Sequence, residues 1–326
     1  MIAAGKYFNP LPALYLFPRG DDFDNVRLYQ RWDESRNLYT QAWDYGSGDM
    51  SFQNPYWIMN KMINQTKKRR YMLSANLKYD VTDWLDVTGR VKVDNADMDI
   101  TEKRYAGTDT NFAGEKGMYS IIKRNDRQIY ADAIANIDLT FAGDYHLSAN
   151  VGASLKDVRM DFMGWGGDLR KIPNFFSITN ISTTNYKERE DGSHIQSQSI
   201  FANVELAWKS MLYLTVTGRN DWESALAFSK YKSFFYPSVG LSAVVSEMVD
   251  MPEWFSFLKV RGSYSAVGSS YAAYLTKPYY DYKGQTHEWD SLHRFPNENL
   301  KPEKTKSWEV GLNARFFGGK LNFDAT

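Results

Sequence analysis

Apolar and polar residues alternate with a period of two along several stretches of this chain. In the clearest stretch, residues 71–79, the odd-numbered side chains are apolar or aromatic, and Ser74, Asn76 and Lys78 lie between them. After a turn near Asp83 and Trp84, the same alternation continues over residues 85–93. Successive side chains of a β-strand point to opposite faces, so this alternation predicts strands with one apolar and one polar face.

The same unit, a strand followed by a tight turn and a second strand, recurs along the chain. Five copies are predicted, over residues 71–93, 131–155, 202–216, 237–267 and 308–323. Long polar stretches separate them, at about 95–128, 157–198, 220–235 and 268–304. Residues 1–64 are less periodic and are predicted to be a loop-rich lead-in with room for one strand. We therefore expect an all-β fold with five β-hairpins, roughly ten antiparallel strands, in residues 65–326.

The alternation of short turns with long loops favours a membrane barrel over a soluble domain. Loops longer than about 12–15 residues are uncommon in compact soluble domains, whereas outer-membrane barrels have short periplasmic turns and long extracellular loops. A strand of about 10 residues tilted by about 45° covers roughly 24 Å, close to the apolar band of about 25 Å in such barrels. The pattern predicts a segment of an antiparallel transmembrane β-barrel.

Aromatic residues gather at the predicted short turns. Rings with one apolar and one polar edge concentrate at membrane–water boundaries, whereas ordinary core rings have no reason to mark one end of every hairpin. The residues expected at this boundary are Tyr79, Trp84, Phe141, Tyr145, Trp208, Tyr213, Trp254 and Phe316.

Composition narrows the function classes. The 39 basic and 39 acidic residues balance, so no global charge favours a nucleic-acid partner, and the absence of cysteine excludes disulfides and thiol chemistry. His287 and His293 flank two carboxylates, but their spacing is not the H-E-x-x-H of zinc proteases. The run Asp21–Asn25 lacks the rest of a calcium-binding loop. We expect no catalytic residues, no metal site and no cofactor.

Two groups of residues are candidates for binding. Aromatic rings in the predicted loops could stack on sugar rings or simply pack the loops, and they are Tyr56, Trp57, Trp165, Tyr279, Tyr280, Tyr282 and Trp289. Counting back along the strand from Tyr71 places Lys67 and Arg69 on the apolar, outward face, away from the short turn. There they would either face lipopolysaccharide phosphates or form a solvated rim.

Several ordered motifs resemble the barrel of SusC/RagA-type TonB-dependent outer-membrane transporters. The most similar stretch is Leu258–Gly268, LKVRGSYSAVG, followed by Asn299–Gly311, NLKPEKTKSWEVG. Further matching stretches are Asn54–Trp57, Lys67–Tyr71, Val216–Ser224 and Phe235–Ser242.

The resemblance implies one wall of a 22-stranded barrel in the outer membrane of a Bacteroidetes-type bacterium. It implies active import of oligosaccharides or peptides, a SusD-like surface lipoprotein as partner, and energy from the TonB complex through an N-terminal region. The signal sequence, the plug and the last strands are expected to lie outside this chain.

Two other classes remain open. A soluble β-rich glycan-binding module would use the aromatic rings as core and binding platform, and it predicts that the apolar faces are buried. An all-β enzyme would need a carboxylate pair or a metal cluster, which the sequence does not offer.

Overall fold

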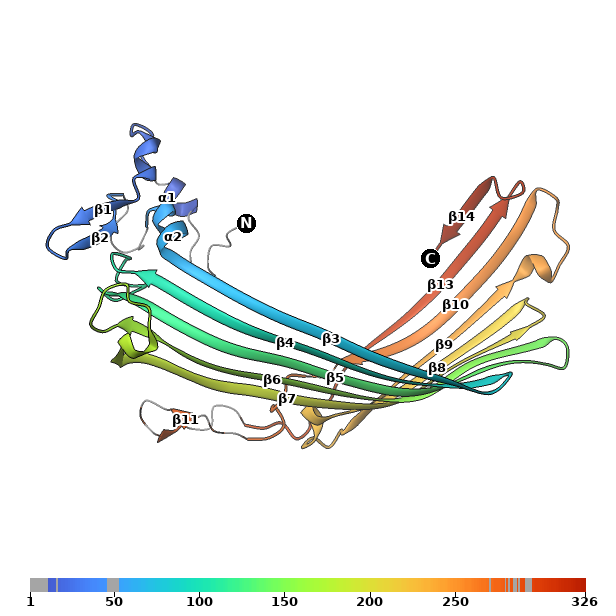
Figure 1. Ribbon diagram of the computed structural model, residues 1–326. Coiled ribbons are helices and arrows are strands. Elements are labelled where there is room, and N and C mark those ends of the chain that lie inside the picture. Colours follow the sequence, from blue (N-terminus) through green and yellow to red (C-terminus); the bar gives the residue numbers. More distant parts are fainter. Residues whose placement is uncertain are drawn as a thin grey trace. The chain divides into compact units, whose positions relative to one another are not determined.

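The chain is almost entirely β-structure. The computed structural model describes residues 11–15, 17–45, 53–269, 271–278, 280, 282–283, 286, 288–290 and 295–326. A ten-stranded antiparallel sheet forms the larger part, and two pairs of short strands accompany it (Figure 1). The prediction of roughly ten antiparallel strands is confirmed. None of the helices in the described part of the chain is long and apolar enough to cross a membrane.

The ten strands of the large sheet follow one another in chain order. From one edge to the other the order is β3, β4, β5, β6, β7, β8, β9, β10, β13 and β14. Their bounds are β3 Met62–Thr82, β4 Leu85–Tyr105, β5 Gly117–Phe141, β6 Tyr145–Leu169, β7 Ile181–Trp208, β8 Leu212–Glu223, β9 Ser233–Val244, β10 Phe255–Ser269, β13 Glu303–Phe316 and β14 Leu321–Ala325.

Shorter elements lie before and between these strands. They are α1 Leu11–Tyr15, the 3₁₀ helix η1 Phe23–Arg27, β1 Gln30–Asp33, β2 Leu38–Gln41, α2 Pro55–Lys61, η2 Ile178–Asn180, η3 Ser224–Leu226, η4 Val245–Glu247, β11 Tyr282–Lys283 and β12 Glu288–Trp289. Residues 1–64 were expected to be a loop-rich lead-in with room for one strand. Their described part contains two short strands, two short α-helices and one 3₁₀ helix, followed by the start of β3.

Tight turns join the strands at one end of the sheet. Two consecutive residues have positive φ in the β5–β6 turn, Ala142 (50°) and Gly143 (74°), and in the β7–β8 turn, Lys209 (51°) and Ser210 (56°). Two successive positive φ angles are typical of type I′ turns, whose twist matches that of the flanking strands. These turns lie where the sequence predicts the hairpin turns.

The strands β3 to β7 are much longer than predicted. They contain 21, 21, 25, 25 and 28 residues, so most of the expected loops at 95–128 and 157–198 are strand. A membrane crossing needs only about 9–11 residues. The prediction of loops failed because it relied on the apolar alternation. That alternation stops where polar side chains such as Asp97 and Asp99 replace apolar ones on the same face, but the strand continues.

The chain divides into two compact units, and each of β3 to β7 contributes to both. Unit 1 comprises residues 1–71, 95–126 and 160–192, and unit 2 comprises residues 72–94, 127–159 and 193–326. Each unit has its own packing.

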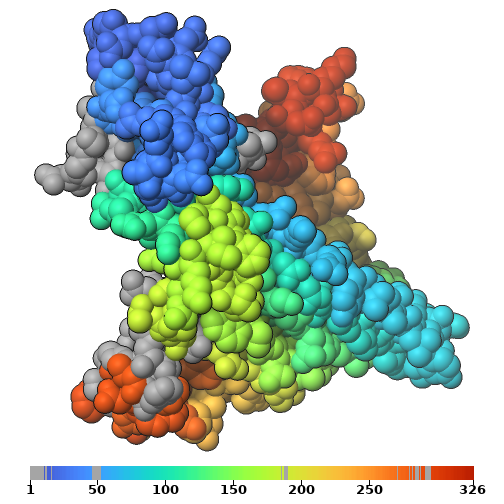
Figure 2. Space-filling view, turned by 60° about the vertical axis from the view of Figure 1, so that its left-hand side comes forward, coloured from blue at the N-terminus to red at the C-terminus, as the bar shows by residue number. Residues whose placement is uncertain are grey.

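Unit 1 packs its N-terminal segment around α2. The side-chain oxygen of Asn54 accepts hydrogen bonds from the backbone N–H groups of Tyr56 and Trp57, and Pro55 occupies the first turn, so the helix starts here. Trp57 is fully buried with Ile58 and Met62, and its indole N–H donates to Thr108 Oγ1 at 3.0 Å. The N-terminal segment, blue in Figure 2, lies against residues near 110.

Unit 2 has two different faces. On the apolar face, Leu77 and Val310 are 75% and 67% exposed. The opposite, polar face carries charged and amide side chains, beginning with Lys78 and Asp86. No second layer of sheet covers the apolar face in the described residues, because the only other sheets there are the two short strand pairs.

Candidate functional site

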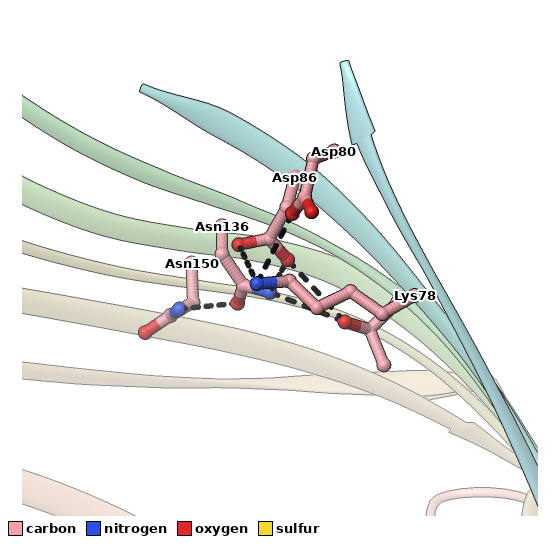
Figure 3. A network of polar contacts seen from close by, with 6 residues as sticks. Lys78, Asp80, Asp86, Asn136 and Asn150 are labelled. Atoms are coloured by element: carbon pink, nitrogen blue, oxygen red, sulfur yellow. Dashed lines mark hydrogen bonds and ion pairs between the residues drawn. The ribbon is translucent and has the colours of Figure 1, made fainter. Parts of the chain in front are cut away.

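The polar face of unit 2 carries a chain of side-chain contacts across β3 to β6. Lys78 Nζ lies 3.1 Å from Asp80 Oδ1 and 3.4 Å from Asp86 Oδ2. The amide of Asn136 donates to Asp86 at 2.6 Å, and the amide of Asn150 donates to Asn136 at 2.7 Å. Figure 3 shows these five side chains pointing toward one another from neighbouring strands. The result is a polar surface of alternating donors and acceptors.

A buried carboxylate anchors the same face further along the strands. Asp132 has a fully buried side chain and receives Arg90 Nε at 2.9 Å and Arg90 Nη2 at 2.7 Å. This two-pronged contact fixes the planar guanidinium, while 51% of the Arg90 side chain stays exposed. A cavity of about 510 Å³ adjoins Arg90, with Asn76, Gln128 and Tyr130 in its lining.

Arginines on β8 and β10 complete the polar face. Arg219 donates to Asp221 at 2.7 Å and to Ser199 Oγ at 2.9 Å. Arg261 donates to Thr326 Oγ1 at 2.6 Å. Positive and negative groups alternate along this surface. It therefore offers hydrogen bonds without one dominant sign of charge, an environment suited to neutral polar molecules.

Most of the aromatic residues predicted at the short turns are exposed there. Phe141 and Tyr145 stack with ring centroids 5.5 Å apart, and Trp254 stacks on Phe316 at 6.1 Å. Tyr79, Trp84 and Trp208 are exposed at the same turns.

Tyr213 was wrongly assigned to this group. Leu212 and Leu214 lie on the apolar face, so the residue between them points to the polar face. There the Lys259 ammonium lies 5.6 Å from the Tyr213 ring centroid.

Among the loop aromatics, Trp57 was wrongly expected to be available for binding. Its burial in unit 1 and its bond to Thr108 make it a core residue. Tyr56 is partly buried and packs against the neighbouring cluster that contains Trp43.

The other loop aromatics stay accessible. Trp165 lies in β6 and is partly exposed, as is Tyr280. Tyr282 and Trp289 face each other across the β11–β12 pair with ring centroids 5.1 Å apart, and Trp289 is 70% exposed. Tyr279 lies outside the described residues.

A second exposed aromatic pair was not predicted from the sequence. Trp32 and Tyr39 are partners across β1 and β2, with ring centroids 5.1 Å apart in an edge-to-face arrangement. The adjoining turn is held by Asp33, whose pKa is lowered chiefly by the hydrogen bond from the Ser35 hydroxyl. Strands β1 and β2 have only four residues each, which is too short for an alternating pattern to be recognised in the sequence.

Lys67 and Arg69 lie in the part of β3 that belongs to unit 1. Both are exposed, and Arg69 Nη2 lies 3.4 Å from Asp99 Oδ2 of the neighbouring strand.

In the described residues, no group of three or more His, Asp or Glu side chains could hold a metal ion. His287 and His293, whose spacing differs from that of zinc proteases, lie outside the described residues.

In a soluble β-sandwich the apolar faces of the two sheets are buried against each other, whereas the apolar face of unit 2 is exposed. The family comparison agrees that the chain is not a soluble sandwich. The family model described as "TonB dependent receptor-like, beta-barrel" matches residues 13–326. The chain belongs to this family. It is a family of outer-membrane receptors and transporters, not of enzymes, so the sheet is a segment of an outer-membrane β-barrel. The alternative of a soluble glycan-binding module is wrong.

Individual relatives cover the chain well but are much longer. The TonB-dependent receptor P26 of Formosa agariphila is 25% identical over 304 residues, 87% of this chain and 30% of that protein. The RagAB peptide importer in its "open-open" state has a TM-score of 0.74 at 17% identity, covering 86% of this chain and 31% of that one. Another structure of the RagAB peptide transporter has a TM-score of 0.72 at 16% identity, covering 86% and 32%. The resemblance to RagA-type barrels is confirmed, and the chain spans about 30% of the length of these relatives.

In this barrel the apolar face of unit 2 contacts lipid and the polar face borders the lumen, as alternation in a membrane barrel requires. The polar contacts described above therefore line the inside of the wall. Sequence reasoning identified the face but not the contacts. Arg90 and Asp132 are 42 residues apart, and the sequence holds no signal for the register that brings them together.

Proposed function

We propose that this chain is one wall of an active transporter that imports oligosaccharides across the outer membrane. The observation that carries the proposal is the contrast between the faces of unit 2, an exposed apolar face and a polar face of paired charges and amides. Hydroxyl-rich cargo exchanges hydrogen bonds with such a lumen without needing a charge of its own. Peptides, whose backbone has the same donors and acceptors, are the second class of cargo.

The transport mechanism needs no covalent chemistry from this wall. Cargo is captured at the extracellular side beneath a SusD-like surface lipoprotein, and a plug within the barrel then rearranges, driven from the periplasm by TonB. The lumen-facing residues Lys78, Arg90 and Arg219 border the path and keep it hydrated.

The exposed loop aromatics are proposed as first contacts for the cargo. Tyr282 and Trp289 present a pair of rings on one short hairpin, and Tyr280 and Trp165 offer further exposed rings. Flat rings pack against the apolar faces of sugars while nearby polar groups bind the hydroxyls. Tyr56 contributes less, because it is partly buried.

Two membrane contacts belong to the same proposal. The exposed aromatics at the short turns form a belt at the periplasmic boundary of the membrane. Lys67 and Arg69 face the phosphates of lipopolysaccharide at the opposite side, where Asp99 orients Arg69 without neutralising Lys67.

Uptake by cells that carry the complete transporter tests the proposal. We expect Trp289→Ala to reduce capture and uptake of labelled oligosaccharides severalfold, and removal of TonB to abolish uptake. Trp308→Ala is the matched control, because Trp308 is also an exposed tryptophan but lies on the lipid-facing side. Uptake of labelled peptides but not oligosaccharides would identify the second cargo class, and uptake of neither would reject the proposal.

A further inference from the structure

The cavity beside Arg90 lies on the polar face of unit 2 and is lined by three neighbouring strands. Its volume of about 510 Å³ falls within the range of about 300–1,000 Å³ that is typical of small-molecule sites. Its polar lining residues share one face of the sheet, at even-numbered positions like those of Lys78, Asp86 and Asp132. They are Ser74 and Asn76 of β3, Arg90 and Lys92 of β4, and Gln128 and Tyr130 of β5, and the intervening Ala75 and Val91 complete the lining.

This cavity brings two cations together without a carboxylate in its lining. Arg90 and Lys92 are both exposed, and none of the residues that line the cavity is acidic. Lys78, nearer the short turn, lies instead between two carboxylates, 3.1 Å from Asp80 and 3.4 Å from Asp86. The protein thus neutralises Lys78 with its own acids but leaves the cavity locally positive.

The buried carboxylate of Asp132 fixes Arg90 along one edge only. It receives Arg90 Nε at 2.9 Å and Nη2 at 2.7 Å. The third guanidinium nitrogen, Nη1, and the Lys92 ammonium have no hydrogen-bond or ion-pair partner among the described residues. Asp132 balances the charge of Arg90, so the charge of Lys92 remains uncompensated. The cavity can therefore accept one negative charge, with donors already held in place to receive it.

Two side-chain amides in the cavity, those of Asn76 and Gln128, also have no partner in the described part of the chain. In the network nearer the turn, by contrast, the Asn136 amide donates to Asp86 at 2.6 Å (Figure 3). The protein supplies the acceptor there but not in the cavity. A ligand with several hydroxyls and one anionic group has the acceptors that these donors require.

We propose that this cavity is a subsite for an acidic sugar unit of the cargo. Its singly charged group, a carboxylate or a sulfate ester, binds between Lys92 and the free edge of Arg90, and its hydroxyls bind the amides of Asn76 and Gln128. One uncompensated cation matches a single charge better than a phosphate monoester, which carries about −1.5 to −2. The inference rests on the proposed import of oligosaccharides and narrows that cargo to chains with negatively charged units.

Binding of labelled oligosaccharides to the purified complete transporter tests the charge requirement. The probes are tetragalacturonate, its neutral methyl ester and a sulfated galactose tetramer, together with an array of further uronate-containing, sulfated and neutral oligosaccharides. We expect acidic members to bind more tightly than their neutral counterparts, and this preference to shrink at about 1 M salt, because salt screens ion pairs.

Each outcome of this measurement is informative. Preference for uronates or for sulfated members identifies which anionic group the cavity takes. Binding of neutral oligosaccharides without any preference for acidic ones would overturn the subsite and leave the proposed function standing. Binding of peptides but of no oligosaccharide would reject both.

Two substitutions locate the subsite. Lys92→Gln is expected to weaken binding of the acidic probes about fivefold relative to the neutral ones, the effect of losing one partly exposed ion pair. Asn76→Asp, which places a carboxylate in the cavity, is expected to weaken acidic probes in the same direction. Lys156→Gln is the matched control, because Lys156 is an exposed cation at a polar-face position of β6 outside the lining.

The control removes the same net charge from the lumen as Lys92→Gln, so it separates a local contact from general attraction of anions. Heat-modifiable gel migration confirms that each variant is folded. Equal weakening of acidic probes by Lys92→Gln and Lys156→Gln, or no weakening by either, would overturn the proposal.

Discussion

The guanidinium of Arg261 lies over Gly311, its direct partner across β10 and β13, in the space that a β-carbon of residue 311 would occupy. A β-carbon placed there would stand 3.0 Å from Arg261 Cγ and 3.1 Å from Cζ. Arg261 lies in the motif Leu258–Gly268 and Gly311 in the motif Asn299–Gly311. The two residues are 50 positions apart in the chain but are direct partners in the sheet. Glycine at 311 thus lets Arg261 lie flat on the lumen wall and reach Thr326.

Substituting this glycine should displace the arginine. We expect Gly311→Ala to destabilise the complete barrel by about 1–3 kcal/mol through overpacking, measured as the denaturant dependence of heat-modifiable migration. Gly262→Ala is the control, because the nearest atom to a β-carbon there is the Glu309 carbonyl oxygen at 3.9 Å. If both variants unfolded alike, the contact between Arg261 and Gly311 would not be the cause.

The Arg90–Asp132 pair predicts an asymmetry between single and double variants. Arg90→Ala leaves a buried carboxylate without its cation and should lower the free energy of unfolding by about 2–3 kcal/mol. The loss is smaller than for a fully buried ion pair, because half of the Arg90 side chain is exposed. The double variant Arg90→Ala/Asp132→Ala should recover part of this loss. Lys92→Ala, an exposed cation on the same face, should change the free energy of unfolding by less than about 0.5 kcal/mol. Additive single and double effects would contradict the interpretation.

Asn54 has two separable roles in unit 1. Its oxygen caps α2, while its amide nitrogen donates to the carbonyls of Val26 and Ala42 at 2.9 and 3.0 Å. Asn54→Asp keeps the cap but loses both donors and buries a charge, so it should destabilise unit 1 more than Asn54→Ser. Protease sensitivity of the N-terminal segment on intact cells measures this difference. Asn60→Asp, at an exposed site of the same helix, is the control.

The ten strands by themselves should not insert as a closed barrel. Strands β3 and β14 are the two edges of the sheet, and each has unpaired backbone N–H and C=O groups. In hydrocarbon each such group costs several kcal/mol. We expect the chain of residues 1–326, refolded alone into lipid vesicles, to show no heat-modifiable band. A folded monomeric band would contradict this expectation.

The sequence by itself determined the faces and the turns of unit 2. A strand alternates its side chains with a period of two, so the assignment of Leu77 to lipid and Lys78 to the lumen needs no knowledge of neighbouring strands. It also indicated the hairpin turns, because each lies between two alternating stretches. The same rule would have placed Tyr213 on the polar face.

Only the tertiary structure decided which residues meet. The pairing of Arg90 with Asp132, the position of Arg261 over Gly311 and the burial of Trp57 beneath Thr108 join residues far apart in the chain. Such contacts depend on strand register, which the packing of the whole sheet sets. The length of β3 to β7 was hidden for a related reason: their backbone pairing continues after the apolar pattern ends, and backbone hydrogen bonds leave no trace in side-chain hydropathy.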